Sequence, residues 1–242
     1  LTLELSCWFE PAIGHSQQIP GVIGPAEKYE IKGEKYIMIT CQPKDQSDLK
    51  PGKYYAKFSV VVKGLIAKTT LTRVFVGEKR WTNEDKYLAM FGLSQVQSSE
   101  TASKFGALAI DFGNEVTHPL IDDSGKQPLI IHLINNGDGK ITKINEITIK
   151  SDMFEDGVSI ECNNFVFDGT SLAFTKFQDI ENIPEQIKPQ DKLPLDYCYA
   201  SIPDTLRETK TPKKRIILGE LNYDYKIEKP TSFEVVKALE LT

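Results

Sequence analysis

The fold class is decided by three consecutive stretches of sequence: Leu129-Ile-Ile-His-Leu-Ile-Asn135, Asn136-Gly-Asp-Gly139 and Ile141-Thr-Lys-Ile-Asn-Glu-Ile-Thr-Ile149. The first stretch is a nearly continuous apolar run with the length of a strand, and the last is a β-branched stretch in which isoleucines are separated by one or two polar residues. The short segment between them is polar and rich in glycine, which is the composition of a turn. Strand, turn and strand predict a β-hairpin.

Apolar and polar residues also alternate in four other segments. Residues 54–62 and 69–76 are each predicted to form a strand, as are residues 215–227 and 232–236. The composition is that of a folded protein, because 40% of the 242 residues are hydrophobic and 26% are charged. The sequence therefore predicts an all-β fold.

One segment departs from the period of two. Residues 83–91 are predicted to form a helix, because Thr82 can cap it and acidic residues fill its first turn, near the positive end of the helix dipole. The Ser- and Gln-rich residues 94–103 follow and are interpreted as a linker.

Two parts of the chain share one order of features. Each contains a cysteine, then the motif I-P-x-x-I-x-P at residues 19–25 or 183–189, then a strand-like run that ends at a second cysteine. This shared order predicts an internal repeat. We expect two β-sandwich modules, residues 1–80 and 106–242, joined by the helix and linker of residues 81–105.

The four cysteines follow the repeat. Cys7 and Cys41 are 34 residues apart, and Cys162 and Cys198 are 36 residues apart. Four free thiols are the alternative, but one pair in each copy is what a duplicated module with its own bridge would show. We therefore predict the disulfides Cys7–Cys41 and Cys162–Cys198, each worth roughly 3–4 kcal/mol. Such bonds persist in an oxidising, extracellular environment.

The two copies differ in the length that precedes their first cysteine. About fifty residues, 107–158, precede Cys162 in the second module and contain three predicted strands, whereas six residues precede Cys7. A sandwich without these strands leaves a sheet edge open. An upstream segment or another subunit, for example residues 233–242 of the next copy, would then supply a strand. The alternative is a smaller sandwich with residues 1–9 as its edge strand.

Composition excludes several classes of function. The net charge of -5 and the scattered lysines disfavour a nucleic-acid surface. No apolar run approaches the roughly 20 residues that span a bilayer. The sequence has no G-x-S-x-G motif, no phosphate-binding glycine loop and no paired CxxC, so we predict no enzymatic activity, no cofactor and no metal site.

The remaining candidate groups have ordinary explanations. Residues 136–140 resemble a calcium loop, but its first and last acidic ligands are missing, so a hairpin turn is the better interpretation. His132 is expected in the core or at a strand edge, and the other histidines and the loop acids are expected in solvent: His15, His118, Asp122, Asp123, Asp152, Glu155 and Asp156. Tyr223 and Tyr225 are the candidates for an exposed carbohydrate-binding strand face.

The second module resembles the Ig-like domains of archaeal cell-surface and pilus proteins. The similarity covers residues 106–236 and rests on the strand at 107–112, the turn at Pro119, the run at 129–139, the cysteine pair and the strand around Tyr223. The apolar strand that runs into N-x-G is also similar to adhesion-type Ig-like modules of bacterial and archaeal surface proteins. The resemblance implies two Ig-like β-sandwich modules and transfers no functional residue.

These observations predict an extracellular structural protein, a subunit of a cell-surface filament or coat. It would assemble with copies of itself or with other surface proteins through β-sandwich contacts or strand donation. The alternative is a monomeric surface module that binds a glycan or a protein.

Overall fold

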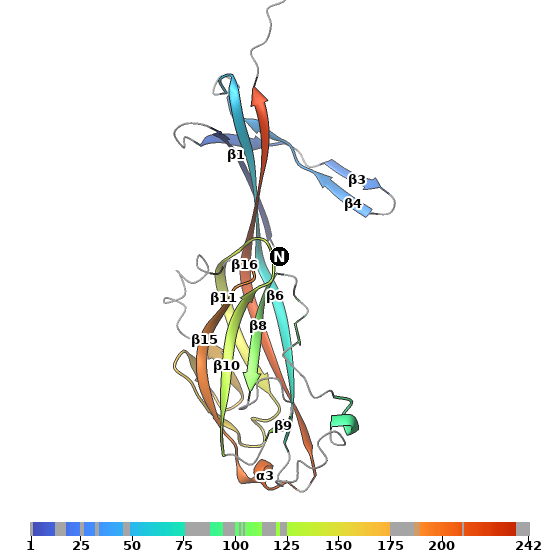
Figure 1. The fold of residues 1–242 in the computed structure, drawn as a ribbon, viewed down its shortest axis with the longest axis vertical. Coiled ribbons are helices and arrows are strands. Elements are labelled where there is room, and N and C mark those ends of the chain that lie inside the picture. The colour runs from blue at the N-terminus through green and yellow to red at the C-terminus, as the bar shows by residue number, and fades with distance from the viewer. Residues whose placement is uncertain are drawn as a thin grey trace, which may run out of the picture. The chain divides into compact units, whose positions relative to one another are not determined.

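The structure is a computed structural model, and strands make up most of it (Figure 1). It describes residues 2–12, 18–24, 27–31, 34–45, 49–75, 88–93, 100–101, 103, 105–112, 120–121, 125–174, 187, 189–209 and 211–235. The all-β expectation is confirmed. None of the described helices is long and apolar enough to cross a membrane.

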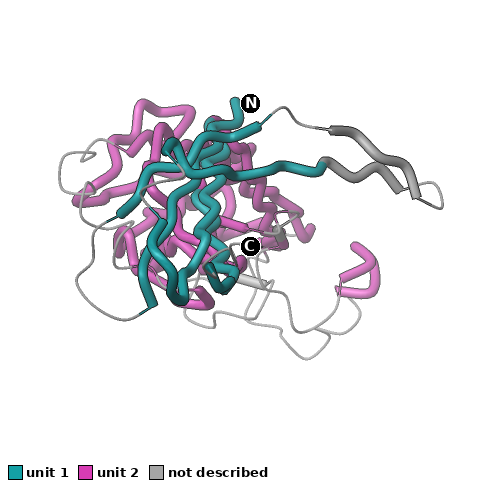
Figure 2. The backbone as a smooth tube through the Cα atoms, turned by 90° about the horizontal axis from the view of Figure 1, so that it is seen from above, with its two compact units in different colours: residues 1–63, 226–242 teal, residues 64–225 magenta. Residues whose placement is uncertain are grey.

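The chain divides into two compact units (Figure 2). Unit 1 contains Leu1–Lys63 and Lys226–Thr242, and unit 2 contains Gly64–Tyr225. These units differ from the predicted modules 1–80 and 106–242. The reason is that two long strands, β6 (Gly52–Phe75) and β16 (Lys213–Val235), each contribute residues to both units.

Unit 2 is a sandwich of two sheets. One sheet has the order β12-β15-β10-β8, and Figure 1 shows β8, β10 and β15 side by side. The other has the order β13-β14-β11-β16-β6, and two short strands, β7 and β9, also pair with β6. The bounds are β7 (Glu100–Thr101), β8 (Gly106–Phe112), β9 (Leu120–Ile121), β10 (Lys126–Asn135), β11 (Lys140–Ser151), β12 (Ser159–Glu161), β13 (Phe165–Phe167), β14 (Ser171–Phe174) and β15 (Lys192–Ser201), with the helix α3 (Asp204–Arg207) after β15.

The core of unit 2 lies between its two sheets. Buried residues alternate with less buried ones along β10 and through the middle of β16, as the period of two requires, whereas every residue of β8 is buried. The buried residues include Leu108, Ile110, Phe112, Leu129, Ile131 and Leu133 from one sheet and Leu71, Ile141, Ile147, Ile149, Ile217 and Leu221 from the other.

The predicted hairpin of residues 129–149 is wrong in its pairing. Both strands form, as β10 and β11, but they belong to opposite sheets, so the turn at residues 136–139 crosses the sandwich. A two-residue hairpin turn of the Asn-Gly type needs positive φ at both central residues. Gly137 is not among the residues with positive φ, and its backbone packs instead against the Tyr225 hydroxyl.

Unit 1 has one sheet, which places β1 (Thr2–Pro11) between β6 and β2 (Ile19–Ile23), followed by β5 (Cys41–Pro43). A separate antiparallel pair is formed by β3 (Glu27–Ile31) and β4 (Glu34–Met38). Phe9 and Tyr54 are buried, and Phe233 of β16 packs against both rings. The described residues of unit 1 therefore do not form the predicted second sandwich.

Two other expectations change. Residues 54–62 and 69–76, and residues 215–227 and 232–236, were expected as separate strands, but each pair lies on one continuous strand, β6 or β16. The linker of residues 94–103 contributes β7, which pairs with β6. The helix of residues 83–91 lies mostly outside the described residues, which include a helical stretch at residues 88–90.

Candidate functional site

Strand β1 is paired along its whole length on one side and for two residues on the other. Towards β6, all of its residues have a partner. Towards β2, Trp8 and Phe9 pair with Pro20 and Ile19. Among the described strands, none pairs with residues 2–6 on that second side, whereas Cys7 is buried beside Gly21 of β2. Residues 2–6 therefore form an open sheet edge, with backbone groups available to another strand.

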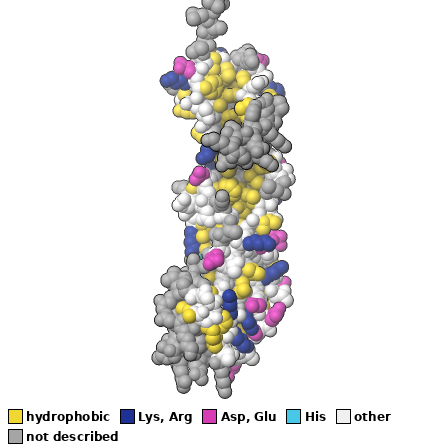
Figure 3. All heavy atoms as spheres, turned by 90° about the vertical axis from the view of Figure 1, so that its right-hand side faces the viewer, with side chains coloured by type: hydrophobic (Ala, Val, Ile, Leu, Met, Phe, Trp, Pro, Cys, Tyr) yellow, Lys and Arg dark blue, Asp and Glu magenta, His cyan; other side chains and the backbone are white. Residues whose placement is uncertain are grey.

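The open edge has one apolar face. Leu3 and Leu5 lie opposite Val62 and Val60 of β6, so the four side chains share a face of the sheet. Leu3 is 58% exposed and Leu5 is 38% exposed. Hydrophobic atoms at the surface are visible in Figure 3, beside interspersed lysines and carboxylates. An exposed edge with alternating leucines is the type of surface that an added strand uses.

The other margin of this sheet is protected. Within unit 1 the sheet ends at residues 226–235 of β16. Glu228, Lys229 and Pro230 are exposed there. Charged residues and proline discourage strand addition, because proline has no N–H to donate. Beyond β2 the sheet ends at β5, a strand of three residues that ends in Pro43. Of these three margins of the sheet, only the one at residues 2–6 of β1 has no proline.

The disulfide Cys7–Cys41 fixes the sheet next to the open edge. Its Cα atoms are 6.1 Å apart, and it joins β1 and β5, the two strands that flank β2. Gly21 of β2 lies against the sulfur atoms, since a Cβ atom there would be 2.5 Å from the Cys41 Sγ and 2.6 Å from the Cys7 Sγ. Glycine is required at this position because any side chain would overlap with the bridge.

The disulfide Cys162–Cys198 has a different setting. It joins β12 to the adjacent strand β15, and its Cα atoms are 4.4 Å apart. Both disulfides have the predicted pairing, and the chain has no free cysteine. They are not in equivalent positions, because the first links strands on either side of a third. The motif of residues 183–189 lies mostly outside the described residues, so the predicted repeat has no support in the described strands.

The buried carboxylate of Asp196 lies beside the second disulfide. Its oxygens accept hydrogen bonds from the backbone N–H groups of Asn164 (2.6 Å) and Tyr197 (2.8 Å). Asp196 and the two cysteine sulfurs lie within 4.8 Å of one another. Both sulfurs are bonded in the disulfide, so they offer no thiolate to a metal. The Asp196 hydrogen bonds and the disulfide therefore fix the backbone of β15 in place.

His132 lies on the sheet face that points away from the core, with Asp111 and Lys192. The Asp111 Oδ2 atom is 3.2 Å from the Lys192 Nζ and 3.5 Å from the His132 Nδ1. Burial lowers the pKa of His132, the nearby Lys192 charge lowers it further, and Asp111 opposes both effects. The fully buried Arg73 guanidinium also interacts with Asp111, and burial lowers its pKa to about 10. We interpret this as a partly buried ion-pair cluster.

The expectation for Tyr223 and Tyr225 is wrong. Both rings are buried, at 1% and 0% exposure. The Tyr223 hydroxyl accepts a hydrogen bond from the Gly106 N–H (2.9 Å), and the Tyr225 hydroxyl accepts one from the Gly139 N–H (2.7 Å). These hydroxyls satisfy backbone groups of β8 in the opposite sheet and of the turn between β10 and β11, so neither tyrosine can contact a ligand.

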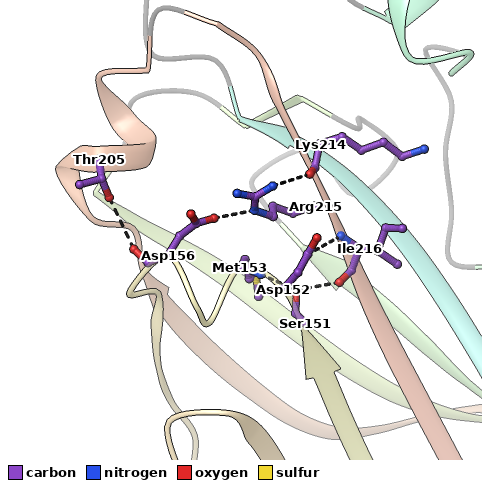
Figure 4. Close-up of polar contacts among 8 residues, drawn as sticks. All are labelled: Ser151, Asp152, Met153, Asp156, Thr205, Lys214, Arg215 and Ile216. Atoms are coloured by element: carbon purple, nitrogen blue, oxygen red, sulfur yellow. Dashed lines mark hydrogen bonds and ion pairs between the residues drawn. The ribbon is translucent and has the colours of Figure 1, made fainter.

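Two acids of the turn between β11 and β12, Asp152 and Asp156, have structural partners (Figure 4), whereas Glu155 is exposed, as expected. Asp156 forms an ion pair with Arg215, which lowers the pKa of the Asp156 carboxyl. The Asp152 carboxylate accepts a hydrogen bond from the Ile216 N–H (2.8 Å). The Ser151 hydroxyl donates to the Ile216 carbonyl (2.7 Å). These contacts tie the turn to β16. His15, His118, Asp122 and Asp123 lie outside the described residues.

Comparisons of the chain with protein-family models, curated proteins and solved structures find no match. The surface features described above are therefore the basis for a functional proposal. Two disulfides and no free thiol are typical of proteins that fold in an oxidising, extracellular environment.

Proposed function

We propose that the chain is a non-enzymatic extracellular structural protein, a subunit of a cell-surface filament or coat. It assembles when a second copy adds a strand to the open edge of β1. The observation that supports this proposal is the unpaired edge at residues 2–6, with Leu3 and Leu5 exposed on one face.

An added strand gains from the edge in two ways. It forms main-chain hydrogen bonds with residues 2–6, and it covers the exposed parts of Leu3 and Leu5. Full burial of a leucine is worth roughly 1.5–3 kcal/mol, and the exposed parts of the two leucines add up to about one side chain, so covering both yields about 1.5–3 kcal/mol.

The unequal margins give the assembly a direction. Because the margin at residues 226–235 carries Pro230 and charged residues, the open edge of β1 is the one that accepts a strand. A contact between two different surfaces of the same chain propagates into a filament when the rotation between neighbouring copies does not close a ring. Phe233 is already packed in its own unit, and the rest of the expected donor, residues 236–242, lies outside the described residues.

The test compares the wild-type chain with the double variant Leu3→Lys and Leu5→Lys. Analytical ultracentrifugation and negative-stain imaging should show wild-type polymers. The variant should remain near the monomer mass of 27.2 kDa, because the loss of about 1.5–3 kcal/mol weakens association roughly 10- to 150-fold. A second variant that lacks residues 236–242 tests whether the C-terminal segment donates the strand.

The matched control is the double variant Thr2→Lys and Ser6→Lys. It places the same two charges on the same strand, but on the opposite face. It should polymerise like the wild type. A wild-type chain that stays monomeric at high concentration, or equal behaviour of the two double variants, would refute assembly at this edge.

A further inference from the structure

Strand β15 carries two tyrosines that the proposed assembly does not use. Tyr197 and Tyr199 are 57% and 53% exposed. Cys198 and Ala200, which alternate with them, are buried, so both tyrosines point away from the core. Two residues along a strand are about 7 Å apart, so the two rings lie beside each other. Among the described exposed hydrophobic residues, no other two aromatic ones are adjacent in this way.

The neighbouring strands complete the surface around these rings. Pro128 and Ile130 of β10 pair with Tyr199 and Tyr197, and both are partly buried. Glu161 of β12 pairs with Tyr199 on the other side. The result is a surface with two aromatic rings at its centre, which we call the tyrosine platform.

A charged pair borders the platform. The Lys126 Nζ lies 5.4 Å from the centre of the Tyr199 ring and 3.3 Å from the Glu161 Oε2. Both charged side chains are more than half exposed. They supply one hydrogen-bond donor group and one acceptor group next to the ring without adding net charge.

The backbone beneath the platform is fixed. Cys198, between the two tyrosines, is bonded to Cys162, the residue directly after β12. The Asp196 carboxylate accepts a hydrogen bond from the Tyr197 N–H (2.8 Å), and the Asn164 side chain donates to the Leu195 carbonyl (2.7 Å). A surface that is held in place before binding loses little entropy when a ligand arrives.

We propose that the tyrosine platform binds a carbohydrate chain. A sugar ring has an apolar C–H face and a rim of hydroxyl groups. The rings of Tyr197 and Tyr199 fit the apolar face, and their hydroxyls, Lys126 and Glu161 fit the rim. The balanced charge at the border and the net charge of -5 disfavour a nucleic acid. A stable protein partner would need a larger apolar centre than two rings supply.

The site lies on unit 2, whereas the proposed assembly edge lies on unit 1. The platform is therefore independent of the proposed function, and it would attach the protein to a polysaccharide surface whether or not the chain polymerises.

The test measures retention of the intact protein on insoluble cellulose, chitin, xylan and mannan, and its affinity for the matching soluble oligosaccharides. We expect the wild type to bind at least one of these polymers. The variants Tyr197→Ala and Tyr199→Ala should each weaken binding about tenfold, and the double variant should abolish it. Tyr197→Phe and Tyr199→Phe keep the rings and should lose threefold or less.

Tyr55→Ala is the matched control, because Tyr55 is 42% exposed and lies on unit 1. It should bind like the wild type. The platform residues are exposed, so all variants should keep the wild-type unfolding midpoint. The proposal is overturned if none of the four polymers retains the wild type, or if the double alanine variant binds as well. It is also overturned if the double variant changes only the self-association of the chain, which would make the platform a protein contact.

Discussion

Replacement of Gly21 by alanine tests how the first disulfide and strand β2 depend on each other. The new methyl group would lie 2.5 Å from the Cys41 Sγ, 2.6 Å from the Cys7 Sγ and 2.9 Å from the Cys7 carbonyl oxygen. Favourable contacts between non-bonded carbon atoms are about 3.5–4.0 Å, so each sulfur is about 1 Å too close. Either β2 moves away from the bridge or the bridge opens.

The two outcomes give a lower and an upper estimate for the loss of stability. If β2 moves and the disulfide survives, the overpacking should cost about 1–3 kcal/mol. If the bridge opens, the loop of 34 residues between the cysteines is released, and the unfolded chain regains entropy worth about 4 kcal/mol. We therefore expect Gly21→Ala to destabilise unit 1 by about 1–4 kcal/mol.

The assay is a double-mutant cycle. Gly21→Ala is made in the wild type and in a background with Cys7→Ala and Cys41→Ala. Unfolding of unit 1 is followed in urea by hydrogen exchange of β2, because the two units need not unfold together. Thiol titration of the denatured protein shows whether the bridge is present. In the background without sulfur atoms, the cost should fall below about 1 kcal/mol.

Equal costs of Gly21→Ala in the two backgrounds would refute this reasoning, because the overlap with sulfur would then not be the cause. A wild-type stability in the single variant, with the disulfide intact, would refute it as well. The glycine would then be incidental to the bridge.

Three further changes test the polar contacts of unit 2. Tyr225→Phe should cost about 1–3 kcal/mol in denaturant unfolding, because the buried Gly139 N–H loses its acceptor; an unchanged midpoint would contradict this. The pKa of Asp156 is lowered in the folded state, so its ion pair stabilises the protein above the ordinary pKa of about 4 and is lost at lower pH. Arg215→Gln should therefore lower the urea midpoint at pH 7 and have a smaller effect at pH 3, and equal effects would exclude a role of the charge. The folded state favours neutral His132, so stability should fall as the pH drops below about 6.5, and His132→Gln should reduce this fall between pH 7 and pH 5. An unchanged pH profile in the glutamine variant would assign the fall to other groups.

The disulfide pairing could be predicted because it depends on the order of residues along the chain. The same alternation that predicts strands also places Tyr197 and Tyr199 opposite to Cys198. A cysteine in a disulfide is usually buried, so this spacing could have identified the exposed pair. Tyr223 and Tyr225 were expected to be the exposed pair instead, because a period of two does not show which face of a strand another sheet covers.

Local sequence patterns could not predict the crossing turn at residues 136–139 or the length of β6 and β16. Asn136-Gly137 has the composition of a hairpin turn, but the contacts of the Tyr225 hydroxyl with Gly139 and Asn135 hold it in the crossing between the sheets. Residues 215–227 and 232–236 were expected as separate strands, yet Pro230 between them lies within β16 at the end of the unit 1 sheet, where a missing N–H costs little. Both outcomes depend on partners far away in the sequence.

The long strands also have a consequence for biosynthesis. The Gly64 N–H donates a hydrogen bond to the Asp224 carboxylate, 160 residues later in the chain. Phe233 packs against Phe9, and these two residues are even farther apart in the sequence. Contacts between such distant residues form slowly, because a long loop must close first. A ribosome makes the N-terminal strands first, so they must wait for almost the entire chain before they reach their partners. During this delay the leucines of β1 are exposed to other nascent chains, and a chaperone that covers them would raise the yield of folded protein.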